Sequence, residues 1–276
     1  MSGDNKLFVE GELDSNLLGS LPLSGWTVQA LKDGGKGALK PRTKSERDYN
    51  THFASYYIRD RDFDYEPSGT LGPHEVGDGM GYRWSRHEIE NYIIDPLIVV
   101  EATGLDWNAY QAALMDAGKM IQHYQASRWA IGLVRRKLPF PYTLDTRPDD
   151  IKAVEFRLPP ALDRESRKQW ALGHSETYKN IVADCLAQKS VEEIFEEKDF
   201  FFQSNEFMAT ENILLWFSGK DLLTSLHDWL AVNGMGEPAS FRIKIRDWMQ
   251  RNSPKVLALL PEWQRFIDIL NQDEEH

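Results

Sequence analysis

The stretch that decides the fold is Tyr56-Tyr57-Ile58-Arg59-Asp60-Arg61-Asp62-Phe63-Asp64, in which an apolar run leads into three acids at alternate positions. Residues 53–58 have the aromatic and β-branched content of a short buried strand. Asp60, Asp62 and Asp64 share one side for as long as the extended conformation lasts. Three carboxylates at one strand tip repel each other, and a hard divalent cation, most naturally Mg²⁺, relieves that repulsion. A polar turn rich in Asp explains the same pattern equally well.

The composition bounds the class of protein. The 276 residues suit one large domain or a domain with a second lobe, and 41% hydrophobic content supports a core. The single cysteine, Cys185, excludes an intrachain disulfide and a cysteine-rich zinc site, which favours a cytoplasmic protein. No apolar run approaches the length of a membrane span, so we expect no membrane partner. The net charge of −11 leaves room only for a local basic patch that binds nucleic acid.

A first pair of acids follows the predicted strand at residues 6–9. Leucines recur at helical spacing from Leu13 onward, so a helix is expected to begin near Asp14. Glu10 would then lie at the carboxyl end of the strand, where open α/β sheets bind ligands, with Asp14 one helical turn further on. The alternatives are an ordinary loop acid for Glu10 and, for Asp14, an acid favoured by the helix dipole.

A basic segment follows the second predicted strand, at residues 26–31. Residues 32–47 carry six basic side chains and two acids, a net charge of +4, and they include glycines that can expose N–H groups to a phosphate. The segment is either a contact patch for a nucleic-acid backbone or a solvated loop. A second basic cluster falls on a predicted helix at residues 126–138. The nucleic-acid contacts that we expect are Lys32, Lys36, Lys40, Arg42, Arg135 and Arg136.

A third set of acids follows a short predicted strand at residues 82–84. Glu88 and Glu90 lie two positions apart and are flanked by apolar residues, and Pro96 marks a boundary. His87 suits a proton carrier or an RNA contact, but we favour a surface histidine because that is the more frequent case.

From residue 99 onward, helical spacing dominates and strand signals are few. We therefore expect a catalytic domain at residues 1–100 and a helical region at residues 101–276 for substrate, partner or dimer contacts. Large apolar side chains in this region are explained mostly by core burial, and they also allow self-association: Trp216, Trp229, Trp248 and Trp263.

The order of strands, acids and basic loop resembles the Toprim domain. The resemblance covers about the first hundred residues and is carried by Phe8-Val9-Glu10-Gly11-Glu12-Leu13-Asp14, Asp60-Arg61-Asp62-Phe63-Asp64 and His87-Glu88-Ile89-Glu90-Asn91-Tyr92. Among Toprim proteins, the chain is most similar to the overcoming-lysogenization-defect type nucleases. Together with residues 216–223, it also resembles the stand-alone Toprim effectors of anti-phage defence. The implied fold is α/β, a small, mostly parallel Rossmann-like sheet between helices, with a large α-helical C-terminal half.

The resemblance implies a metal-dependent phosphodiesterase with Mg²⁺ or Mn²⁺ as cofactor. Its catalytic residues would be Glu10, Asp60 and Asp62, and its metal ligands Glu10, Asp14, Asp60, Asp62, Glu88 and Glu90; Glu12 and Asp64 have no firm counterpart. Two metal ions can clamp the attacking and leaving oxygens of a phosphodiester, which requires four to six carboxylates from separate segments.

The resemblance also implies a biological setting. The protein would be the toxic effector of a defence system, cleaving RNA, with tRNA favoured and DNA left open. It would be held inactive by an ABC-type ATPase subunit of the same system and be active as a homodimer. The alternative is a non-catalytic or regulatory Toprim subunit, whose acids bind metal only to shape a surface for nucleic acid or a partner protein.

Overall fold

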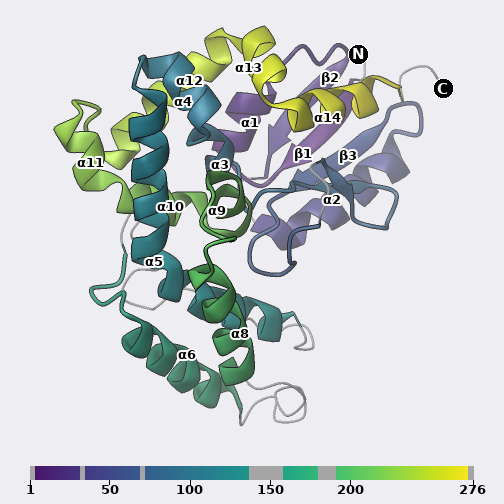
Figure 1. Cartoon of the computed structure of the whole chain (residues 1–276). Coiled ribbons are helices and arrows are strands. Elements are labelled where there is room, and N and C mark those ends of the chain that lie inside the picture. Colours follow the sequence, from purple (N-terminus) through teal and green to yellow (C-terminus); the bar gives the residue numbers. More distant parts are fainter. Residues whose placement is uncertain (1–3, 32–34, 69–71, 137–157, 180–190, 273–276) are drawn as a thin grey trace. The chain divides into compact units, whose positions relative to one another are not determined.

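The computed structural model describes residues 4–31, 35–68, 72–136, 158–179 and 191–272 (Figure 1). Its contacts divide the chain into two compact units. The sheet unit comprises Met1–Arg61, Ser68–Gly104 and Arg242–His276, and the helical unit comprises Asp62–Pro67 and Leu105–Phe241. The domain boundary expected near residue 100 stays a prediction, and the last helices of the chain belong to the sheet unit.

The sheet contains five strands within the described residues, in the order β2-β1-β3-β5-β4. The strands are β1 (Asn5–Val9), β2 (Trp26–Ala30), β3 (Ser55–Arg59), β4 (His74–Glu75) and β5 (Gly81–Arg83). β1 pairs in parallel with β2 and β3, β3 pairs in parallel with β5, and the short β4 pairs antiparallel with β5. This small, mostly parallel sheet among helices confirms the expected α/β class, and the four predicted strands correspond to β1, β2, β3 and β5.

Helices cover both faces of the sheet. The helices of the sheet unit include α1 (Glu12–Leu18), α2 (Gly35–Tyr49), α3 (Glu90–Ile93), α4 (Pro96–Thr103), α13 (Ser253–Leu259) and α14 (Pro261–Gln272). On one face, Leu39 of α2 is buried against Phe8 and Tyr57. On the other face, the ring of Phe266 in α14 lies 5.6 Å from that of Tyr82. The sheet is therefore enclosed as the middle layer of three.

Most of the basic segment at residues 32–47 forms the helix α2 instead of the solvated loop that the sequence allowed. The helix runs from Gly35 to Tyr49 with Pro41 in its interior, although an interior proline costs about 3 kcal/mol. The complete burial of Leu39 against the sheet offsets that cost. The basic side chains from Lys36 onward are thus spaced by a helix, so residues four apart lie on one face.

The helical unit is built on the 29-residue helix α5 (Trp107–Arg135), against which α6 (Arg164–Lys179) and α8 (Val191–Gln203) pack. The remaining helices are α9 (Thr210–Trp216), α10 (Gly219–Ser225), α11 (His227–Val232) and α12 (Pro238–Arg251), whose first residues belong to this unit. Phe202, Phe207 and Phe217 form its aromatic core, with ring centroids 4.8 to 5.2 Å apart. Throughout the described part of the chain, no helix has both the length and the apolar character needed to cross a membrane.

Candidate metal centre

Acidic residues follow the carboxyl ends of three neighbouring parallel strands. β1 ends just before Glu10, β3 ends just before Asp60, and β5 leads into the loop that carries Glu88. Because β1, β3 and β5 are adjacent and parallel, their carboxyl ends meet at one edge of the sheet, where α/β proteins bind ligands. We call the six predicted ligands that follow these strands the acidic edge: Glu10, Asp14, Asp60, Asp62, Glu88 and Glu90.

A hydrogen bond joins the ends of β1 and β3 at this edge. The Oε1 atom of Glu10 accepts a hydrogen bond of 3.0 Å from the backbone N–H of Asp60. Asp14 lies in the first turn of α1, and its Oδ2 atom lies beside Gly11, 3.4 Å from where a Cβ on that glycine would stand. The fold therefore ties the side chain of Glu10 to the main chain at the end of β3 and places the side chain of Asp14 beside Gly11.

The loop after β5 is tied to the end of β3 by a buried arginine. Arg61 is 1% exposed, its backbone N–H donates to the carbonyl of His87 (3.0 Å), and its Nε donates to the carbonyl of Ser85 (3.1 Å). Within the loop, the Oδ1 atom of Asn91 accepts from the N–H of Glu88 at 3.0 Å. These bonds bring the third group of acids to the edge on a rigid support.

The same loop is anchored from α14 by Glu262, which no local signal in the sequence reveals. Its carboxylate accepts hydrogen bonds from the N–H (2.8 Å) and Oγ (2.6 Å) of Ser85 and from the hydroxyl of Tyr92 (2.5 Å). Burial raises the pKa of Tyr92 well above its ordinary value of 10.0, and the nearby charge of Glu262 raises it further. Tyr92 therefore remains a proton donor to Glu262 at neutral pH.

Three side chains at this edge can hold a metal ion. One ligand atom from each of Asp62, His87 and Glu88 lies within 4.8 Å of the other two. Asp62 is placed there by its peptide bond to Arg61, whose N–H is bonded to His87. His87 is 1% exposed, so the expectation of a surface histidine is wrong: the bonds from Arg61 fold its loop inward against β3.

The charge of the acidic edge favours a cation. Asp14, Asp60, Glu88 and Glu90 are each less than a tenth exposed. Buried carboxylates are costly unless positive charge compensates them. Arg242 lies 3.2 Å from Glu90 and compensates part of this negative charge. The carboxylates of Asp62 and Glu88 fit a hard divalent cation, and His87 adds one nitrogen donor.

Asp64 does not join the other acids, which corrects the alternation expected from the sequence. The extended conformation of β3 stops at Arg59, and Asp62 has a positive φ of 51°, which turns the chain. Asp64 accepts a hydrogen bond of 3.1 Å from Nε of Arg135 in the helical unit. The three aspartates thus do not share one side, because the strand ends too early.

The predicted nucleic-acid contacts have varied surroundings. Lys32 lies outside the described residues, and Arg42 pairs with Glu46 at 3.4 Å. Arg135 is bonded to Asp64, and the guanidinium of Arg136 lies 4.0 Å from the ring centroid of Tyr65. These two arginines hold residues 62–67 within the helical unit, and their contact with nucleic acid stays a prediction. Lys36 and Lys40 line a pocket.

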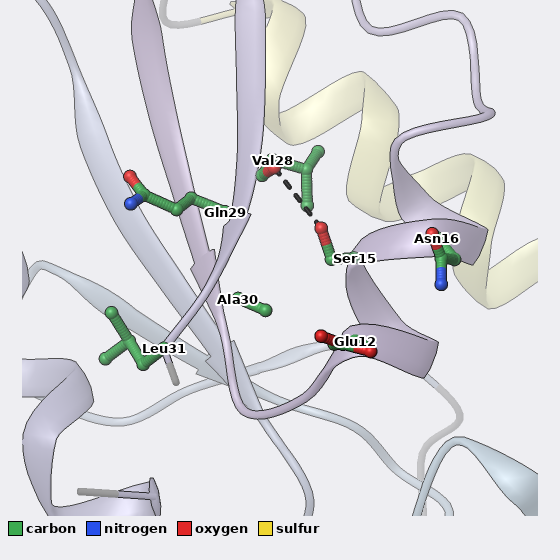
Figure 2. Close-up of a pocket in the computed structure, with 7 residues that line it drawn as sticks. All are labelled: Glu12, Ser15, Asn16, Val28, Gln29, Ala30 and Leu31. Atoms are coloured by element: carbon green, nitrogen blue, oxygen red, sulfur yellow. Dashed lines mark hydrogen bonds between the residues drawn. The ribbon is translucent and has the colours of Figure 1, made fainter. Parts of the chain in front are cut away.

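A separate cavity of about 760 Å³ lies between α1 and the edge strand β2. Figure 2 shows Glu12 and Ser15 on α1 beside β2, with the Oγ of Ser15 donating to the carbonyl of Val28 (3.3 Å). Glu12, the acid without a counterpart in the Toprim pattern, lines this cavity, whereas Glu10 and Asp14 do not. The cavity is therefore distinct from the acidic edge.

No protein-family model matches the chain, and no curated protein matches it.

Proposed function

We propose that this protein is a Toprim-type metal-dependent nuclease that cleaves phosphodiester bonds of nucleic acid. The observation that carries the proposal is that acids follow three neighbouring parallel strands at one edge of the sheet, with Glu10 accepting a hydrogen bond from the backbone of Asp60. Asp62, His87 and Glu88 support it because they can hold a metal ion at the same place. Mg²⁺ or Mn²⁺ suits the carboxylate oxygens best.

The residues at the edge have separable tasks in such a reaction. A divalent cation bound there supplies neutralisation of phosphate charge and activation of water for attack. The backbone N–H of Asp60 orients the carboxylate of Glu10, so this predicted ligand is held in place before substrate binds. Arg61 and Glu262 keep the loop of His87 and Glu88 in position.

We further propose that the nuclease is the toxic effector of an anti-phage defence system. The support is the resemblance of residues 8–14, 60–64, 87–92 and 216–223 to stand-alone Toprim effectors, of which the AriB subunit of the PARIS system is the example that this sequence resembles. In that setting an ABC-type ATPase subunit holds the effector inactive, and release allows a homodimer to cleave RNA, with tRNA the favoured substrate.

The deciding experiment is a cleavage assay on tRNA, single-stranded RNA and DNA with Mg²⁺ or Mn²⁺. The protein is assayed alone and together with the product of its neighbouring gene, with Glu10→Gln as the matched inactive variant. Cleavage that requires metal and is absent from Glu10→Gln supports the nuclease. Metal binding without cleavage of any substrate, under both conditions, overturns it and favours the non-catalytic Toprim subunit.

A further inference from the structure

A second pocket, of about 370 Å³, lies between α2, the strand β3 and the turn that follows β4 in the sheet unit. One wall carries Lys36 and Lys40 of α2, which are four residues apart and share a face of the helix. Tyr57 and Arg59 come from β3, and Gly77 and Asp78 from the turn between β4 and β5. The volume is roughly ten times the share of one water molecule, which leaves room for a hydrated phosphate.

The turn that closes the pocket is firmly built. Oδ1 of Asp78 accepts from the N–H groups of Met80 and Gly81, both at 3.0 Å, and Oδ2 accepts from the hydroxyl of Tyr57 at 2.8 Å. Gly77 has a φ of +79°, a conformation that favours glycine. The pocket is therefore part of the folded framework.

The pocket carries a net positive charge. Lys36, Lys40 and Arg59 are cationic, and Asp78 is the single acid among its lining residues. Burial raises the pKa of Asp78, but the bonds from Tyr57 and Met80 and the nearby Lys40 (3.3 Å) hold it below its ordinary value of 3.8. Asp78 is therefore ionised at neutral pH, and the net charge of the lining is +2.

The pocket adjoins the acidic edge. Arg59, the last residue of β3, lines the pocket, and the next residue, Asp60, donates its N–H to Glu10. A positive pocket and a negative, metal-binding edge thus meet at consecutive residues. One strand of nucleic acid has a regular series of phosphates, so it can occupy both places at once.

We propose that this pocket binds a phosphate of the nucleic-acid strand, next to the phosphodiester that lies at the acidic edge. The proposal rests on the proposed nuclease function. Tyr57 is 2% exposed and offers no ring on which a base can stack. The lysines recognise phosphate as point charges, so the pocket holds the backbone of RNA or DNA and reads neither base nor sugar.

The test is the salt dependence of binding without cleavage. Fluorescein-labelled 12-nucleotide RNA and DNA of one sequence are titrated in EDTA, and anisotropy gives Kd at several salt concentrations. For Lys40→Gln we expect about fivefold weaker binding at 0.1 M salt and a log–log slope lower by about 0.7, the value for one phosphate contact on a single strand. Lys40→Glu changes the charge by two units, so it should double the loss of binding free energy and the decrease in slope. The RNA and the DNA should respond equally.

The controls separate the pocket from the general charge of α2. Lys44→Gln removes the same charge one turn further along α2, from an exposed residue outside the pocket, and should leave the slope unchanged. Asp78→Asn removes a negative charge from the pocket and should tighten binding of the oligonucleotide. This change is opposite to that of the Lys40 variants, and misfolding does not produce it. If Lys44→Gln and Lys40→Gln weaken binding equally, or if Lys40→Glu does not weaken binding, the proposed phosphate site is wrong.

The pocket and the nuclease can fail separately. If the protein cleaves with metal but both Lys40 variants keep the wild-type salt slope, the pocket is not a phosphate site and the nuclease proposal is unaffected. Lys40-dependent binding in a protein that cleaves no substrate with Mg²⁺ or Mn²⁺ supports a phosphate site and disproves the nuclease.

Discussion

The carboxylate of Glu10 accepts a hydrogen bond from the backbone of Asp60, 50 residues further along the chain. The bond crosses from the end of β1 to the end of β3, its parallel neighbour. It fixes the side chain of one predicted ligand by the main chain of another, so a change at Glu10 affects both charge and geometry.

These two effects can be separated by substitution. Glu10→Gln keeps an oxygen acceptor for Asp60 and removes the charge, whereas Glu10→Ala removes both. We expect both variants to lose more than about 100-fold in cleavage rate, since loss of groups that merely support metal ligands costs 10–100-fold. Only Glu10→Ala should also lose about 1.5–3 kcal/mol of unfolding free energy in urea titrations. Wild-type activity in folded Glu10→Gln would contradict the catalytic assignment.

The aspartates after β3 provide a matched set for metal binding. Wild-type melting temperature should rise by about 5–10 °C at 100 times the Kd for Mg²⁺ or Mn²⁺, because the ion binds only the folded state. Asp60→Asn and Asp62→Asn should gain much less, although in EDTA they should match or exceed wild type because a repulsive charge is gone. Asparagine tolerates the positive φ of position 62.

Asp64→Asn is the control for that series. It weakens the pair with Arg135, so its melting temperature should start below wild type, yet its metal-induced shift should be unchanged. Equal metal-induced shifts in all four proteins would show that Asp60 and Asp62 are not ligands.

Alkaline pH tests the anchor between Tyr92 and Glu262. The pKa of Tyr92 is raised in the folded protein, first by burial and then by Glu262, whereas the unfolded chain loses this proton near pH 10. The stability contributed is therefore full below about pH 10 and is lost as pH rises above it. The urea midpoint should fall more steeply above pH 10 in wild type than in Tyr92→Phe; equal slopes would contradict the anchor.

Asp221 should be structural. Its side chain is fully buried, forms an ion pair with Arg128 and accepts from Gln125 at 2.8 Å. Asp221→Ala leaves a buried guanidinium uncompensated and should cost about 3–5 kcal/mol in urea unfolding. Asp228→Ala, at an exposed aspartate, should have little effect. A stable Asp221→Ala protein would mean that Arg128 finds another partner.

Local patterns in the sequence predicted where the acids follow the strands, and Asp62 and Glu88 of the six predicted ligands belong to the group that can hold a metal ion. The apolar runs end at Val9 and Ile58, shortly before Glu10 and Asp60, and the parallel pairing of β1 and β3 places the ends of both strands at one edge of the sheet. The burial of His87 and the pairing of Asp64 with Arg135 were not predictable, because they depend on contacts between distant segments. Membership of the Toprim family stays a prediction.

The bond between Glu262 and Ser85 also sets an order of events during synthesis. Glu262 is added 177 residues after Ser85, which takes about 10–35 s at ordinary translation rates. Until α14 has left the ribosome, the loop of His87 and Glu88 lacks that anchor. The arrangement of Asp62, His87 and Glu88 that can hold a metal ion is therefore supported from α14 only late in synthesis.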